Sequence, residues 1–236
     1  MIARRIALLK RWLWPLRPIL HPVWRLVQPL FGRNAAVRAA ASTPPATLSV
    51  KHVPGTIRPL TKREFTFIEA NDSYYRGRWN YLSVAAAQAT ELIERHDLHT
   101  ALELGPWARP LIVGADAMDR IERPDLQKEG LLIVHDATIA PWPVQDKAYD
   151  LFVGLQVFEH LKGKQTIAFG EVRRVARHAI ISLPIDWVLE DTRNSHHGLT
   201  EERARSWFLP VEPTRVVLGN PGPKKRLIFV FEDLPG

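Results

Sequence analysis

The chain has 236 residues, 46% hydrophobic and 24% charged, which is the composition of a folded domain that buries a core. It contains no cysteine, which excludes disulfide scaffolds, cysteine-ligated zinc and a cysteine nucleophile. The net charge of +7 is uneven, because residues 1–63 hold 12 Lys and Arg and no acid, whereas residues 64–236 hold 20 bases and 25 acids. A basic arm therefore precedes a mildly acidic body, and the body carries no nucleic-acid signature.

The arm, residues 1–40, mixes tryptophan with arginine. Trp12, Trp14 and Trp24 lie among basic and aliphatic residues, a mixture typical of segments that bind the headgroup region of a membrane. Its longest uncharged stretch is shorter than the ~20 apolar residues of a transmembrane helix, and four prolines divide it into short pieces. We expect a basic N-terminal helical extension that contacts a membrane surface through this arm. Packing on its own domain, or disorder, is the equally weighted alternative.

Residues 40–60 are rich in Ala, Ser, Thr and Pro, which is typical of a linker. The sequence is thus divided into an extension and linker, 1–60, and a domain, 61–236. No secretory signal is indicated, since bases interrupt any apolar core, and the early serines of a mitochondrial presequence are missing. The predicted location is the cytoplasm, with peripheral attachment to a membrane through the arm as a refinement.

The domain is predicted to alternate helices and strands. Residues 62–95 form a helix with an alanine-rich end, and further helices cover 164–176 and 199–208, the last with Thr200 as N-cap. Seven short apolar segments are predicted strands: 99–104, 115–119, 131–135, 149–154, 178–183, 214–218 and 226–231. This order predicts an α/β fold with a Rossmann-like, doubly wound, mostly parallel sheet covered on both faces.

Ligands of such sheets bind at the carboxyl ends of the strands. Glu103 and Gly105 stand at the end of the first strand, and a glycine there lets the backbone approach a ligand closely. Asp119 ends the second strand, 16 residues after Glu103, close to the ~20 at which an acid meets nucleotide ribose hydroxyls. Asp136 follows the third strand, where it could meet an adenine amine, and Gln156 follows the fourth. One such residue is commonly a turn or cap, but their order predicts a nucleotide-type cofactor site.

Residues 99–184 resemble the methyltransferase domains of the type 11 and type 12 kind, which are class I enzymes that use S-adenosyl-L-methionine. Leu102-Glu103-Leu104-Gly105-Pro106 is similar to the first cofactor motif of that family. The run DATIAPWPVQDKAYDLFVGLQVFEHL, residues 136–161, is similar to the family's passage of acid, small residues, Pro, Asp, strand and Glu-His-Leu. The resemblance implies a seven-stranded sheet with an antiparallel C-terminal hairpin, here around residues 220–223.

The resemblance also implies the roles of the five predicted cofactor-binding residues. Glu103 and Gly105 would line the methionine and ribose side of the cofactor, Asp119 would hold the ribose hydroxyls, and Asp136 would face the adenine. Gln156 would close the pocket beneath the sulfonium.

The chain departs from the family pattern after Gly105. Trp107 stands where the family has a second glycine. Only ~9 residues separate Gly105 from the next strand, so the first helix of the family must be short or replaced by a loop. Arg109-Pro110-Leu111 matches the form of a subset of bacterial members. These departures concern the pose of the methionine tail.

Methyl transfer from a sulfonium needs mainly alignment and exclusion of water, although a hydroxyl acceptor gains from a general base. His160 is the first candidate base, and His197, from the pair His196-His197, is the second. A structural role for His160 and a solvated loop for the pair are the plain alternatives. A metal site through the pair and Asp191 stays an open alternative, although nothing fixes a ligand geometry and no metal-binding residue is predicted.

The segment at the end of the fourth strand narrows the class of methyl acceptor. Gly154-Leu155-Gln156-Val157 stands where methyltransferases of nucleic-acid amines carry Asn-Pro-Pro-Tyr, which argues against a nucleic acid. We predict methyl transfer to a small-molecule, saccharide or lipid-linked hydroxyl. One alternative is a catalytically inactive module that binds a membrane or a partner. Another, a nicotinamide-dependent dehydrogenase, is disfavoured because Gly-x-Gly-x-x-Gly and Tyr-x-x-x-Lys are both missing.

Overall fold

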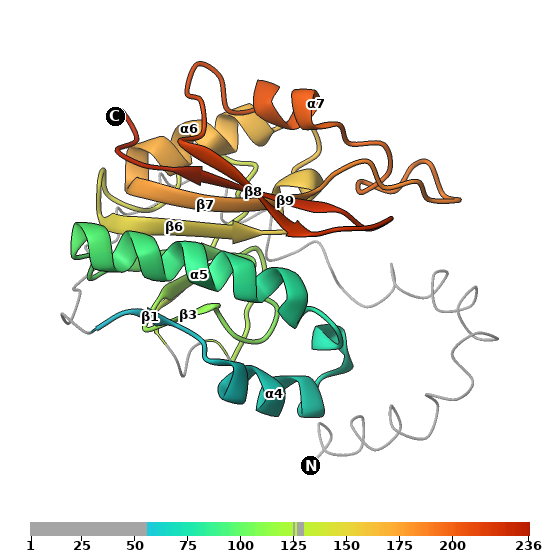
Figure 1. The fold of residues 1–236 in the computed structure, drawn as a ribbon. Helices are drawn as coiled ribbons and strands as arrows, with labels where there is room; N and C mark the ends of the chain where they lie inside the picture. The colour runs from blue at the N-terminus through green and yellow to red at the C-terminus, as the bar shows by residue number, and fades with distance from the viewer. Residues whose placement is uncertain (1–55, 125, 127–129) are drawn as a thin grey trace, which may run out of the picture. The chain divides into compact units, whose positions relative to one another are not determined.

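The computed structural model describes residues 56–124, 126 and 130–236 (Figure 1). The predicted membrane contact through residues 1–40 and most of the predicted linker lie outside these residues. No helix in the described part of the chain is both long and apolar enough to cross a membrane.

A seven-stranded sheet forms the centre of the domain, in the order β5-β4-β2-β6-β7-β9-β8. Its strands are β2 (Ala101–Leu104), β4 (Asp116–Asp119), β5 (Leu132–Val134), β6 (Tyr149–Leu155), β7 (Ala176–Pro184), β8 (Arg215–Asn220) and β9 (Arg226–Phe231). The first five run parallel, and β9 is antiparallel to both β7 and β8. The predicted mostly parallel sheet with an antiparallel C-terminal hairpin is confirmed.

A second, two-stranded sheet ties the predicted linker to the domain. In it β1 (Arg58–Pro59) pairs with β3 (Ile112–Val113), which occupies the stretch between β2 and β4. Ile57 and Leu60, on either side of β1, are buried in the hydrophobic core. The end of the predicted linker is therefore part of the folded domain, because its two aliphatic side chains remove apolar surface from water there.

The predicted helix over 62–95 is two helices, α4 (Lys62–Asn71) and α5 (Trp79–His96), with the short 3-10 helix η4 (Ser73–Tyr75) between them. The prediction of one continuous helix was wrong. Asp72 ends α4 in an extended conformation and accepts a hydrogen bond from the Tyr74 amide, and Gly77 adopts a φ of +69°. An acid that caps a new turn and a left-handed glycine are both helix breakers, and together they outweigh the helical periodicity on either side.

The other helices in the described residues are η6 (Phe158–His160), which was not predicted, and α6 (Gln165–Val175) and α7 (Glu201–Ser206), which lie within the predicted helices 164–176 and 199–208. The Thr200 hydroxyl accepts a hydrogen bond from the Arg203 amide, so the predicted N-cap of α7 is confirmed. Between β2 and β4 the described chain forms a loop and β3 rather than a helix, as the short spacing after Gly105 led us to expect.

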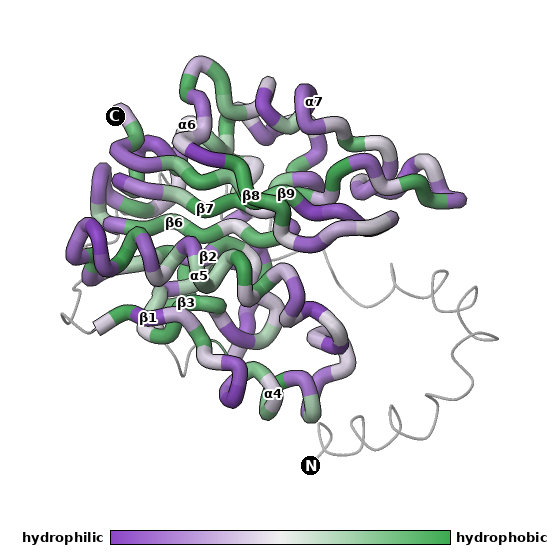
Figure 2. Tube along the Cα trace, in the orientation of Figure 1, coloured by the Kyte–Doolittle hydropathy of each residue, from purple (hydrophilic) through white to green (hydrophobic). Residues whose placement is uncertain are grey.

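The sheet separates two hydrophobic cores (Figure 1). Leu151 and Val153 of β6 face the core under α5, whereas Phe152 between them faces the core under α6 and α7. Strands buried on both faces read as continuous apolar runs, and Figure 2 shows such runs along β6, β7 and β9. The charged residues of these three strands, Asp150, Arg177 and Arg226, consequently stand at or next to the strand ends.

Candidate cofactor and acceptor site

Glu103 lies in β2 and is only 4% exposed. Its Oε2 accepts hydrogen bonds from the amides of Leu111, at 2.7 Å, and Ile112, at 3.3 Å. Burial raises the pKa of Glu103 to about 8, although the two amides act in the opposite direction. Glu103, which is predicted to line a cofactor, therefore also holds the loop between β2 and β3. Its raised pKa means that its carboxyl group changes charge near pH 8.

Gly105 forms the tight turn that leaves β2. Its φ is +62°, its amide donates to the carbonyl oxygen of Met118 at 2.8 Å, and a Cβ added to it would lie 3.0 Å from Cγ2 of Val157. Both the backbone angle and the contact require glycine. The turn thereby brings the end of β2 close to the segment that follows β6.

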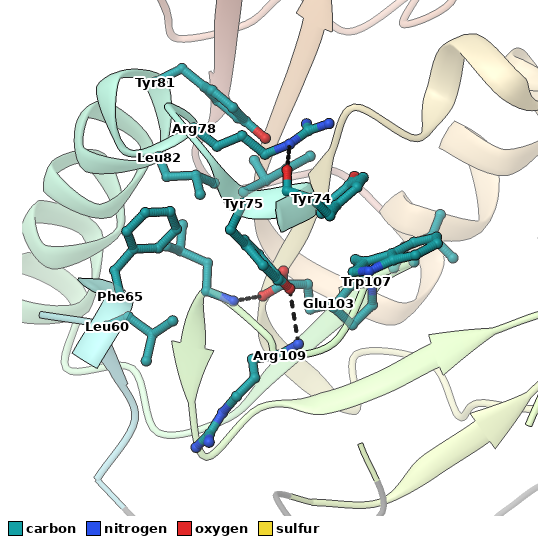
Figure 3. A pocket seen from close by; sticks show the side chains of 15 residues that line it. Leu60, Phe65, Tyr74, Tyr75, Arg78, Tyr81, Leu82, Glu103, Trp107 and Arg109 are labelled. Carbon is teal, nitrogen blue, oxygen red and sulfur yellow. Dashed lines mark hydrogen bonds between the residues drawn. The ribbon is translucent and has the colours of Figure 1, made fainter. Parts of the chain in front are cut away.

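A pocket opens above this turn, and helical residues form its opposite wall (Figure 3). Tyr75 of η4 points into it, and its hydroxyl accepts hydrogen bonds from the amides of Ala108, at 2.9 Å, and Arg109, at 3.1 Å. Phe65 of α4 and Tyr81 of α5 line the same wall. The segment before β2 thus fixes the loop that in this chain replaces a helix. The sequence analysis missed this wall, whose visible signal is the aromatic cluster at 74–81.

Trp107, in the position of the family's second glycine, connects this wall to β4. Its ring stacks on Tyr74 with centroids 4.6 Å apart, and its indole nitrogen donates to Asp72 at 3.0 Å. On the other side, the Arg123 guanidinium carbon lies 4.7 Å from the Trp107 ring centroid, and Arg123 Nε lies 3.3 Å from Asp119 Oδ2. A row of stacked side chains therefore runs from η4 to the acid at the end of β4.

Asp119 and Asp136 lie at the same edge of the sheet as Glu103. Asp119 is buried, and its Oδ1 accepts a hydrogen bond from the Ile121 amide at 3.2 Å. Asp136 is exposed, and its Oδ1 accepts from the amide and hydroxyl of Thr138 at 2.9 and 2.7 Å. Burial acts to raise the pKa of Asp136, but these hydrogen bonds outweigh it and lower the pKa. Both acids are held by local turns, with Asp119 additionally paired to Arg123.

Gln156 adopts a φ of +57°, a backbone conformation that is uncommon for a residue with a side chain. Its side-chain amide donates to Ser182 Oγ at 3.2 Å and its Oε1 accepts from Arg226 Nε at 2.9 Å. The side chain is thus directed toward β7 and β9, and its neighbour Leu155 lines the pocket instead.

Arg226, at the start of β9, was not singled out by the sequence analysis. Its guanidinium carbon lies 4.5 Å from the ring centroid of Tyr81 and 4.7 Å from that of Trp187. Burial lowers the pKa of this arginine. No local sequence pattern predicts this role for Arg226, because the rings of Tyr81 and Trp187 come from α5 and from the loop after β7.

His160 and His196 meet where β6 and β7 end. Their ring centroids are 4.9 Å apart, and His160 Nδ1 lies 2.8 Å from Ser195 Oγ. Burial lowers the pKa of His160, with a further lowering from His196 that Glu159 opposes. His160 is thus biased toward the neutral form that a general base requires.

His197, the second predicted base, has a different environment. Its Nδ1 accepts a hydrogen bond from the Leu189 amide at 3.0 Å, so this nitrogen holds the loop. The imidazole that the structure brings to His160 is that of His196. Of the predicted pair, it is therefore His196 that lies beside His160, whereas the predicted base was His197.

The fold of the domain is the class I methyltransferase fold. The seven-stranded sheet, parallel from β5 to β7 and completed by the antiparallel hairpin of β8 and β9, is the one that the resemblance implies. Glu103, Gly105, Asp119 and Asp136 all lie at the carboxyl ends of its parallel strands.

No family model and no curated protein matches the sequence. Among solved structures, the chain is similar to N-methyltransferase NodS from Bradyrhizobium japonicum WM9 in complex with S-adenosyl-L-homocysteine, at 16% identity and a TM-score of 0.49, over 73% of this chain and 95% of that one. It is also similar to magnesium protoporphyrin IX methyltransferase (ChlM) from Synechocystis PCC 6803 with bound SAM, at 11% identity and a TM-score of 0.47, over 65% and 79% of the two chains.

Proposed function

We propose that the protein is an S-adenosyl-L-methionine-dependent methyltransferase that acts on a hydroxyl group of a small-molecule, saccharide or lipid-linked acceptor. One observation carries the proposal. The Glu103–Gly105 turn and Asp119 end adjacent parallel strands, β2 and β4, and β2 is where the strand order reverses. Open α/β sheets bind their ligands at this switch point.

The residues at the edge fit an adenosyl cofactor. Gly105 is part of the lining of the pocket beside the turn, where a ligand can contact its backbone. Asp119 offers carboxylate oxygens to ribose hydroxyls once its Arg123 partner shifts, and Asp136 offers acceptors to an adenine amine. The cofactor supplies a methyl group already activated by its sulfonium, and the aromatic wall of η4 and α5 excludes water from the pocket.

The acceptor would enter between the ends of β6 and β7. His160 is half exposed there, and in its neutral form it can take the proton of an acceptor hydroxyl. Ser195 holds its Nδ1, which leaves Nε2 for that role. The acidic charge balance of the body favours an acceptor that is not a nucleic acid.

The first test is calorimetric titration of the full chain with S-adenosylhomocysteine, with NADH as the control ligand. We expect saturable binding of the first alone, and Asp119→Ala should weaken it at least tenfold while the circular dichroism spectrum stays unchanged. Glu202→Ala, which removes an exposed carboxylate on α7, is the matched control and should bind as the unaltered chain does. A folded chain that binds no S-adenosylhomocysteine would refute the proposal.

One observation favours a second candidate, a methyltransferase-like module without catalysis. Arg123 pairs with Asp119 and stacks on Trp107, so the ribose-binding acid is already engaged. The same titration separates the candidates, because a module that has lost the cofactor will not respond to S-adenosylhomocysteine. In that case Arg123→Ala should not create binding.

A further inference from the structure

We propose that Glu159, His160 and His196 form a binding site for one divalent transition-metal ion of the Zn²⁺ or Mn²⁺ type. Glu159 and His160 lie in η6, directly after β6, and His196 lies in the loop after β7. The site is separate from the acids at the ends of β2, β4 and β5, and its existence does not depend on the proposed cofactor.

The three side chains present one ligand atom each at the spacing a metal needs. These atoms lie within 4.8 Å of one another. Glu159 Oε1 is 3.3 Å from Nε2 of His196 and 3.9 Å from Nε2 of His160. Two ligands of a tetrahedral ion, each ~2.1 Å from it, are ~3.4 Å apart. One ion can therefore bind all three atoms after small side-chain adjustments.

The environment of the Glu159 carboxylate is the observation that calls for a bound cation. Its side chain is 0% exposed, and neither carboxylate oxygen has a hydrogen-bond partner among the described residues. The other buried glutamates are different, since Glu103 and Glu171 each accept hydrogen bonds from backbone amides. A buried carboxylate without a donor is unfavourable, and such groups are paired or bind metals. A cation between the two imidazoles satisfies this one.

The two imidazoles are oriented as metal ligands are. His196 Nδ1 lies 2.8 Å from Asn194 Oδ1, an acceptor, so Nδ1 carries a proton, and in the neutral ring the Nε2 lone pair faces Glu159. His160 Nδ1 lies 2.8 Å from Ser195 Oγ, which can accept the proton of Nδ1, and in that tautomer the Nε2 lone pair is available to an ion. Outer partners of this kind fix the tautomer and the ring direction of metal-binding histidines. The partners, Asn194 and Ser195, stand directly before His196 in the same loop.

The described residues contain a second cluster of possible ligands, His96, His178 and Asp233, and it differs from the first. His96 Nε2 is already 2.9 Å from Glu232, and His178 Nδ1 accepts from the Asp233 amide at 3.3 Å. Asp233 is exposed, so no buried carboxylate there lacks a partner. This cluster therefore gives no reason to expect an ion.

Two imidazoles and one carboxylate define the class of metal. This set is typical of zinc sites that keep a fourth position open; imidazole also suits iron, and the carboxylate also suits manganese. Mg²⁺ and Ca²⁺ prefer oxygen ligands throughout. His160 is half exposed, so the open position would face solvent at the acceptor side of the sheet. There the ion, with His160 Nε2 as its ligand and no longer as a base, would polarise an acceptor hydroxyl and ease the loss of its proton to water, a consequence that rests on the proposed function.

The test is titration of the full, tag-free, EDTA-stripped chain with ZnCl₂ and with MnCl₂ by calorimetry. We expect one equivalent of at least one of the two ions to bind in the micromolar range or tighter. Glu159→Gln, His160→Gln and His196→Gln should each weaken binding at least tenfold. His99→Gln, which alters an exposed imidazole far from the cluster in sequence, is the matched control and should leave binding unchanged.

A measurement on the unaltered chain covers variants that fail to fold. In histidine-selective NMR spectra, Zn²⁺ should shift the imidazole nitrogens of His160 and His196 before those of the other seven histidines. No saturable binding of either ion, or shifts confined to other histidines, would overturn the site. Failure of S-adenosylhomocysteine binding alone would refute the proposed function and leave the metal site standing.

Discussion

Replacing Gly105 with alanine gives the sharpest test of the turn at the end of β2. Two costs are expected. An L-residue in the left-handed conformation costs about 1–2 kcal/mol relative to glycine, and Gly105 has a φ of +62°. The new Cβ would also lie 3.0 Å from Val157 Cγ2, well inside the ordinary contact distance, and overpacking of this kind costs about 1–3 kcal/mol.

The expected destabilisation by Gly105→Ala is therefore about 2–5 kcal/mol, measured as the change in free energy of unfolding by urea. Gly77→Ala and Gly163→Ala are matched controls, because both glycines have positive φ but no atom within 4 Å of an added Cβ. Each control should lose only the conformational part. The difference between Gly105 and the controls isolates the contact with Val157.

A double-mutant cycle tests that contact directly. Val157→Ala removes Cγ2 and by itself costs about 1–1.5 kcal/mol of transfer free energy. Combined with Gly105→Ala it should recover about 1–3 kcal/mol relative to the sum of the single changes. A coupling energy near zero, together with a Gly105→Ala cost no larger than that of Gly77→Ala, would refute the close approach of the two segments.

Two further changes test the loop that replaces the family's first helix. Tyr75→Phe removes the hydroxyl that accepts from Ala108 and Arg109, so it should destabilise the domain by about 1–3 kcal/mol; a change below 0.5 kcal/mol in urea unfolding would show that the loop is held otherwise. Glu103 has a pKa raised to about 8, so the folded chain retains a proton that the unfolded chain releases between about pH 4.5 and pH 8, and stability should fall as pH rises through that window. Glu103→Gln keeps an acceptor for the Leu111 amide and should flatten this dependence between pH 5 and 8; a slope equal to that of the unaltered chain would refute the assignment.

The sheet could be predicted from the sequence because its strands are buried on both faces. Runs such as that of β6 are apolar at nearly every position, and their spacing with helices fixes a parallel order. The positions of Glu103, Asp119 and Asp136 at strand ends could also be predicted, since strand ends are local features. Their common position at one edge then follows from topology alone.

The features of the site that could not be predicted from the sequence depend on contacts between distant segments. Trp107 departs from the family motif, and its stacking on Tyr74 and Arg123 joins three elements that no local pattern links. In the pair His196-His197, which imidazole turns inward is decided by the hydrogen bonds of the loop rather than by residue type. Sequence periodicity carries no information on either choice.

The position of Arg226 has a consequence for how the protein is made. Its guanidinium contacts Tyr81, from the first half of the described domain, and Trp187, while its Nε holds Gln156. Arg226 opens β9, the last strand of the sheet. Contacts this far apart along the chain form only after the later partner has been synthesised. The part of the edge where β7 ends beside the start of β9 is therefore completed last, after the turn at Gly105 and the acids at the ends of β4 and β5 have left the ribosome.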